Sequence, residues 1–102
     1  MQAIIWKMNN IKFKRSFIKS LQIDIEMYAE TEKDSEIKER LYALAKKIRL
    51  SDPMSDDSVS LLEQELIEKV AQFEKSADKS SSIEEIETLL IKRNKKVKAI
   101  KG

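Results

Sequence analysis

Carboxylates are the side chains of this sequence that could carry acid–base or metal chemistry. Two acidic clusters stand out, and they consist of Glu63, Glu65, Glu68, Glu84, Glu85 and Glu87. Bundles that hold two iron ions place Glu on facing helices, but they also need a Glu-x-x-His element. The 102 residues include no His and no Cys, so that element, the usual general base and any thiolate ligand are missing. We therefore predict no metal and no other cofactor.

The motifs of common enzyme classes are missing as well. The sequence has one Gly and one Pro, and it contains no Gly-rich phosphate loop, no GxSxG, no HExxH and no EF-hand ligand series. A chain without Cys has no disulfide scaffold and suits a reducing compartment. We predict that the protein is not an enzyme.

Apolar residues recur at helical spacing through most of the chain, and they indicate the elements that would position any site. The most regular of four such stripes contains Val59, Leu62, Leu66, Val70, Phe73 and Ala77. Each amphipathic helix must bury its stripe, and short connections favour antiparallel neighbours. The sequence predicts an all-α protein with an antiparallel up-down-up-down four-helix bundle.

Polar residues mark where these helices begin and end. The first helix is expected over about residues 10–30, and the second opens at Asp34 or Ser35. Residues 51–58, SDPMSDDS, are the clearest break because Pro and the Ser/Asp cluster favour a turn. Residues 78–82, DKSSS, then precede the fourth helix, for which Ser82 and Glu85 predict a capping box.

Three segments are predicted along the chain. They are an N-terminal arm at residues 1–9, the four-helix bundle at 10–94 and a basic C-terminal tail at 95–102. Met8 is an alternative start, which would make residues 1–7 an upstream extension. No signal peptide and no run of roughly 18 apolar residues is recognised, so we expect a cytoplasmic protein without a transmembrane segment.

Charge is distributed unevenly, although the formal net charge is only +2. Residues 1–23 carry five cations and no acid, residues 24–87 carry all 18 acids with nine cations, and residues 88–102 carry six cations. With alternating helix directions, the start of the first helix and the ends of the second and fourth meet at one end of the bundle. We call the cations expected there the basic pole: Lys12, Lys14, Arg15, Lys46, Lys47, Arg49, Lys92, Arg93, Lys95, Lys96, Lys98 and Lys101.

The basic pole predicts a binding surface for phospholipid headgroups, nucleic acid or an acidic protein face. A simpler interpretation is that these lysines complement helix dipoles and keep the chain soluble. Nucleic acid would be held through its phosphates, because the third helix is acidic and offers no base-reading side chains. A small regulatory protein that binds nucleic acid or an acidic protein through the pole is the alternative function.

A chain of this length, with four amphipathic helices and a basic C-terminal segment, resembles the immunity proteins that protect Gram-positive bacteria against pediocin-like (enterocin-type) bacteriocins. The resemblance covers the whole chain as architecture. It implies a non-enzymatic protein at the inner face of the membrane, which protects the producer cell by binding the bacteriocin-receptor complex. It also implies that the C-terminal half helps to select the bacteriocin, and residues 89–102, LLIKRNKKVKAIKG, stand in that position.

The predicted tail is expected to serve binding more than folding. The apolar stripe of the fourth helix thins after Leu90, while positive charge continues to the end of the chain. Val97 and Ile100 are the large apolar residues of the tail, and the alternative is that they are the last core contacts of the fourth helix.

Overall fold

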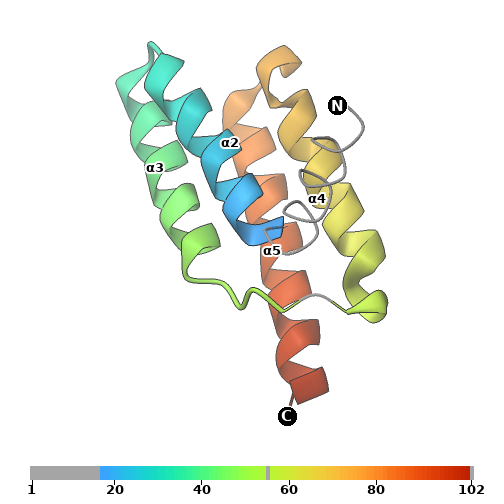
Figure 1. Ribbon diagram of the computed structural model, residues 1–102. Coiled ribbons are helices and arrows are strands. Elements are labelled where there is room, and N and C mark those ends of the chain that lie inside the picture. The colour runs from blue at the N-terminus through green and yellow to red at the C-terminus, as the bar shows by residue number, and fades with distance from the viewer. Residues whose placement is uncertain (1–16, 55, 102) are drawn as a thin grey trace, which may run out of the picture.

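The computed structural model describes residues 17–54 and 56–101 (Figure 1). Every regular element within these residues is helical, and no strand occurs among them. The α-helices are α2 (Phe17–Thr31), α3 (Ser35–Arg49), α4 (Ser60–Gln72) and α5 (Lys79–Lys101), and the short 3-10 turns are η1 (Asp57–Val59) and η2 (Phe73–Lys75). The predicted all-α fold is confirmed for this part of the chain.

The start of α3 follows the sequence prediction. Asp34 is extended, and its Oδ1 accepts hydrogen bonds from the backbone N–H groups of Glu36 at 2.9 Å and Ile37 at 3.3 Å. These bonds satisfy two of the N–H groups that a helix leaves unpaired in its first turn. The predicted first helix corresponds to α2, which ends at Thr31, whereas its expected start and the N-terminal arm lie outside the described residues.

The start of α5 corrects two predictions. Because α5 begins at Lys79, Ser82 lies inside the helix and is not its cap. The carboxylate of Asp78 instead accepts hydrogen bonds from the backbone N–H and the hydroxyl of Ser81, both at 3.1 Å. An ionised carboxylate is a stronger acceptor than a hydroxyl, so the helix starts about one turn earlier than predicted. Ala77, which was assigned to the third apolar stripe, is exposed in the link between η2 and α5.

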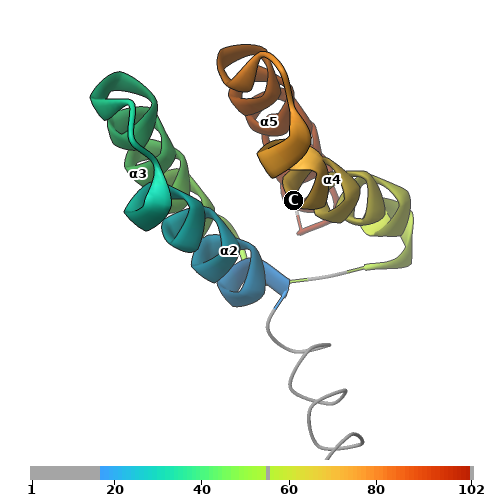
Figure 2. The ribbon, with the colours of Figure 1, turned by 90° about the horizontal axis from the view of Figure 1, so that it is seen from above.

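The helices pack as two hairpins that lie against each other, α2 with α3 and α4 with α5 (Figure 2). Between the hairpins, α3 packs against α5 and α2 packs against α4. Two contacts set the register of α3 on α5: Arg40 donates a hydrogen bond to Ser80, and further along Lys47 donates one to Glu87. The last turn of α3 therefore lies beside the middle of α5.

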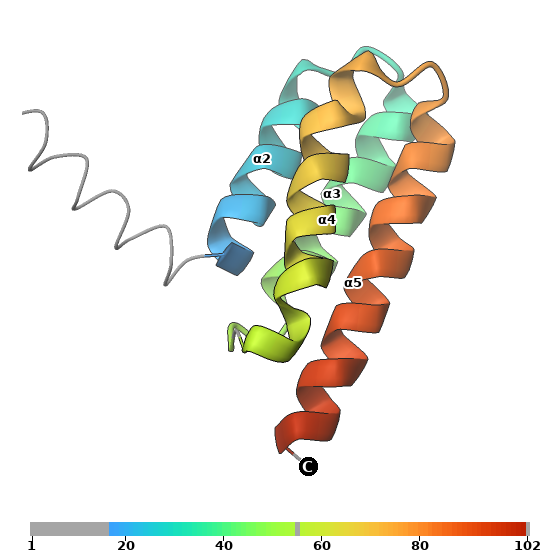
Figure 3. The same cartoon turned by 90° about the vertical axis from the view of Figure 1, so that its right-hand side faces the viewer.

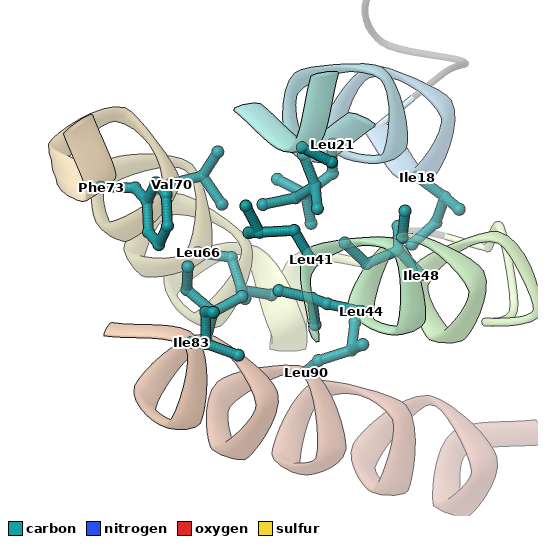
Figure 4. Packing of buried hydrophobic residues seen from close by; sticks show 14 residues of the cluster. Ile18, Leu21, Leu41, Leu44, Ile48, Leu66, Val70, Phe73, Ile83 and Leu90 are labelled. Carbon is teal, nitrogen blue, oxygen red and sulfur yellow. The ribbon is translucent and has the colours of Figure 1, made fainter. Parts of the chain in front are cut away.

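One apolar cluster joins the two hairpins (Figure 4). It consists of Ile18, Leu21, Ile25, Ala29, Leu41, Leu44, Ala45, Ile48, Leu66, Val70, Phe73, Ile83, Ile86 and Leu90. Tyr28 reinforces the contact of α2 with α4, because its hydroxyl donates to the carbonyl oxygen of Val70 at 2.9 Å and its ring centroid lies 5.2 Å from that of Phe73. The apolar stripes read from the sequence thus meet in a common core, and the helices form a bundle.

The helix α5 is longer than its neighbours and extends beyond them (Figures 1 and 3). It has 23 residues, against 13 in α4 and 15 in α3, and each residue adds about 1.5 Å. Residues 95–101 are the last turns of this one helix, so the predicted boundary before the tail falls inside it. Val97 is fully buried there, while Ile100 is 44% exposed.

Candidate binding surface

The described part of the basic pole lies on two adjacent helices. Its exposed cations are Lys46, Lys47 and Arg49 in the last turn of α3, and Lys92, Lys95, Lys96 and Lys98 on α5. Lys12, Lys14 and Arg15 lie outside the described residues, and Lys101 belongs to α5 without a described side chain. The structure therefore places seven of the predicted cations as exposed side chains on two adjacent helices.

The four exposed lysines of α5 lie on the side of the helix that faces away from the bundle. Successive residues of an α-helix turn by about 100°, so Lys92, Lys95, Lys96 and Lys98 are spread over roughly half of the helix surface. The fully buried Val97 marks the side of this segment that faces the bundle. The projecting end of α5 consequently presents positive charge to any partner that approaches it from outside.

One lysine of the pole is already engaged by an acid of the chain. Lys47 Nζ lies 2.7 Å from Glu87 Oε2. Both side chains are partly exposed, and surface ion pairs of this kind contribute about 0–1 kcal/mol. The contact links the end of α3 to α5.

Arg93 is not available to a partner, and this corrects its place in the predicted binding surface. Its side chain is fully buried. It lies three residues after Leu90 and four before Val97, so it continues the buried stripe of α5. That spacing was visible in the sequence and could have indicated an inward-facing arginine.

The buried guanidinium of Arg93 uses all five of its N–H donors. Nε and Nη2 donate to Glu63 Oε2 at 3.1 and 3.0 Å. Nη1 donates to the carbonyl oxygen of Asp52 at 2.6 Å and to Asn94 Oδ1 at 3.0 Å, and Nη2 also donates to the carbonyl oxygen of Met54. This arrangement compensates the loss of hydration that a buried charge incurs.

The same contacts fasten the connection between the two hairpins. Figure 1 shows this connection passing beside α5 on its way from α3 to α4. Asn94 Nδ2 donates to Ser51 Oγ at 2.9 Å, and Ser51 Oγ donates to the carbonyl oxygen of Lys47 at 2.9 Å. Residues 51–54 are thus held against α5 by Arg93 and Asn94. Sequence reasoning located this break in the helices but not its attachment.

Acidic residues gather around the connection between α2 and α3, and one of them is paired with a lysine. Glu32 Oε1 lies 3.0 Å from Lys79 Nζ, and the hydrogen bond from Lys79 lowers the pKa of the Glu32 carboxyl. Lys79 Nζ also lies 5.8 Å from the ring centroid of Phe73. Asp34 caps α3, while Glu30 and Glu36 are exposed. Glu26 accepts a hydrogen bond from Gln22 at 3.1 Å.

Three of the six glutamates in the two acidic clusters are paired with a cation in the structure. Glu63 is paired with Arg93, and Glu87 is paired with Lys47. Glu85 Oε2 lies 2.7 Å from Lys69 Nζ, and this hydrogen bond raises the pKa of Lys69. No group of three or more His, Cys, Asp or Glu that could hold a metal ion occurs among the described residues.

Comparison with known proteins identifies no relative: no family model, no characterised protein and no solved structure matches the chain. Among the described residues, no helix combines the length and the apolar character needed to cross a membrane.

Proposed function

We propose that the protein is a non-enzymatic binding protein whose basic pole docks on an anionic partner, and that it serves as a bacteriocin immunity protein of the enterocin type. One observation carries the proposal: exposed cations occupy the last turn of α3 and the second half of the adjacent helix α5, which projects from the bundle. Charge concentrated on one end of a molecule raises the local concentration of anionic partners and speeds their association.

We also propose that consecutive helices run in opposite directions, up-down-up-down. The C-terminal ends of α3 and α5 then point toward the same end of the bundle. Supporting contacts run in opposite senses along α4 and α5, because Glu63 pairs with Arg93 while the later Lys69 pairs with the earlier Glu85. Between α3 and α5, Arg40 pairs with Ser80 and the later Lys47 pairs with the later Glu87, which supports the same direction for these two helices.

In the immunity role the protein works in the cytoplasm, peripheral to the inner face of the membrane, and binds the complex of the bacteriocin with its receptor. This role follows the resemblance in length, helical architecture and basic C-terminal turns. Binding alone blocks the complex, so the role needs neither a catalytic group nor a cofactor.

Expression in a strain sensitive to an enterocin-type bacteriocin tests the proposal. The wild-type chain should raise the bacteriocin concentration that stops growth, and the pair Lys95→Gln with Lys98→Gln should lower this protection by about tenfold. The matched pair Lys33→Gln with Lys75→Gln removes two exposed lysines outside the basic pole and should leave protection unchanged. Lack of protection by the wild type, or equal losses for both pairs, contradicts the proposal.

Nucleic-acid binding is the second candidate, and the four exposed lysines on the outer side of α5 favour it. A duplex DNA or RNA hairpin would be bound through phosphates, and the logarithm of the binding constant would then fall with the logarithm of salt concentration by about 0.9 per phosphate neutralised. Salt-sensitive retention of either nucleic acid, together with no protection of the sensitive strain, would establish this function instead.

A further inference from the structure

An apolar notch lies between α3 and α5 beside the exposed lysines. Leu50, which ends α3, is 69% exposed, and Ile91 of α5 is 55% exposed. Together with Leu90 they line a notch of about 280 Å³, with Ser51 and Asn94 among its polar residues. Two large apolar side chains are therefore presented to solvent in one concave site, which is unfavourable unless a partner covers them.

Cations flank this notch on both helices. On α5, Lys95 and Lys98 follow Ile91 by four and seven residues, so the three side chains lie on one face of the helix. On α3, Lys46 precedes Leu50 by four residues and shares its face in the same way. The acid in the lining, Glu87, is paired with Lys47 at 2.7 Å.

We propose that this notch receives one large apolar side chain from an acidic segment of a partner protein, whose neighbouring carboxylates are bound by Lys46, Lys95 and Lys98. The proposal deepens the proposed function, because it rests on a protein partner at the basic pole and identifies how that partner is held. An apolar anchor seated in a pocket and surrounded by charged groups is the usual energetic centre of a protein interface. Complementary charge around the anchor adds speed and selectivity.

The shape and chemistry of the notch favour a protein over the other anionic partners. Nucleic acid offers phosphates but no aliphatic side chain, so its binding would leave Leu50 and Ile91 exposed. Lipid bilayers are entered by apolar side chains that project from a surface, whereas Leu50 and Ile91 line a hollow.

Ile67 of α4 provides a matched comparison. It is 47% exposed, close to the 55% of Ile91, and both are isoleucines inside a helix. Glu68 lies next to it, and Glu63 and Lys69 nearby are both ion-paired. Ile67 therefore has the exposure of Ile91 without the surrounding free lysines.

A phage-displayed library of random peptides, selected on the full-length chain, tests the inference. Retained peptides should share one large apolar residue flanked by Asp or Glu. For the strongest of them, made synthetically, the Kd should rise by about tenfold or more with Leu50→Ala, Ile91→Ala or Lys95→Gln. Ile67→Ala and Lys33→Gln should bind it like the wild type. Circular dichroism of each variant should show an unchanged fold, because all five side chains are exposed.

Several results would overturn the inference. Retained peptides without the acidic and apolar pattern would do so. An equal loss of peptide affinity for Ile67→Ala and Ile91→Ala would do so as well. Another outcome is that no peptide is retained, while the wild type binds phosphatidylglycerol vesicles or DNA and Leu50→Ala and Ile91→Ala weaken that binding. This outcome would assign the notch to the vesicle surface or to DNA. If sedimentation shows a dimer of the wild type and Leu50→Ala dissociates it, the notch would be assigned to a second copy of the chain.

The protection assay distinguishes failure of the notch from failure of the immunity role. Peptide binding that depends on Leu50 and Ile91, in a chain that does not protect the sensitive strain, supports the notch and refutes the immunity role. Protection that survives both alanine substitutions, with no peptide retained, refutes the notch alone.

Discussion

At the scale of single residues, Arg93 shows that charge alone does not decide a role. Lys92 and Arg93 are neighbours in the basic C-terminal sequence, yet Lys92 is exposed and Arg93 is fully buried. The planar guanidinium can bond Glu63 and two backbone carbonyls at once, and it also lies 5.6 Å from the ring centroid of Phe17. Lysine has a single ammonium group and cannot reproduce this set of contacts.

Arg93→Met should therefore destabilise the fold instead of weakening binding selectively. It removes the guanidinium that neutralises Glu63 and the donors to the carbonyl oxygens of Asp52 and Met54, and breaking a buried ion pair costs about 3–5 kcal/mol. Urea unfolding followed by circular dichroism measures this loss. Lys92→Met is the control and should change the free energy of unfolding by about 0.5 kcal/mol or less. A similarly small effect of Arg93→Met would show that the buried network contributes little.

At the scale of elements, α5 combines segments that the sequence suggested were separate. Its start is capped by Asp78, its middle anchors the connection between the hairpins, and its end carries the exposed lysines. The end is also part of the fold, because η1 packs against α5 and both Val59 and Val97 are fully buried. Among residues 95–102, which were expected to contribute little to folding, Val97 is therefore now expected to contribute, and the residues after it are not.

Val97→Ala should lower the thermal midpoint clearly, while Ile100→Ala should change it little. Val97 is fully buried and Ile100 is 44% exposed. Removing the two outer methyl groups of a buried valine costs about 1.5 kcal/mol, which corresponds to a fall of roughly 6–12 °C in a domain of this size. Thermal unfolding followed by circular dichroism compares the two variants. Equal, small shifts would mean that the last turns of α5 are not required by the fold.

At the scale of the whole molecule, several carboxylates stabilise the points where helices join. Glu32 is bonded to Lys79 between the two hairpins, Asp56 accepts from the N–H of Ser58 before η1, and Asp78 caps α5. In each case hydrogen bonds to the ionised form lower the pKa of the carboxyl. Burial acts in the opposite direction on Asp24 and raises its pKa.

Acid should consequently weaken the fold through these joints. A carboxyl with a lower pKa in the folded state is protonated first in the unfolded state, so its stabilisation is complete above its ordinary pKa and is lost as pH falls below it. The ordinary values are 3.8 for Asp56 and Asp78 and 4.5 for Glu32. Asp78→Asn keeps a capping side chain and should make the thermal midpoint less dependent on pH below about 4.5. Asp24→Asn should make the dependence steeper, and a profile that neither variant changes would contradict this account.

The sequence by itself determined the helices and most of the core, because both depend on local spacing. Residues three and four apart share a face in any α-helix, so the stripe through Leu66, Val70 and Phe73 could be assigned without a fold. Asp34 was one of the two caps predicted for α3, with Ser35, for the same local reason, since its partners lie two and three residues away. The prediction of Ser82 as the cap of α5 was wrong because Asp78, about one turn earlier, offers a stronger acceptor.

Only the tertiary structure decided which charges of the C-terminal sequence are available to a partner. The hydrogen bonds of the buried Arg93 join residues 30, 39 and 41 positions apart in the sequence. They can form only when α4 and the connection between α3 and α4 are packed beside α5. The notch likewise forms because α3 packs against α5, which places Leu50 beside Ile91 although 40 residues separate them in the sequence. Local spacing specifies the face of a helix, but the neighbour that covers this face is selected by packing across the whole molecule.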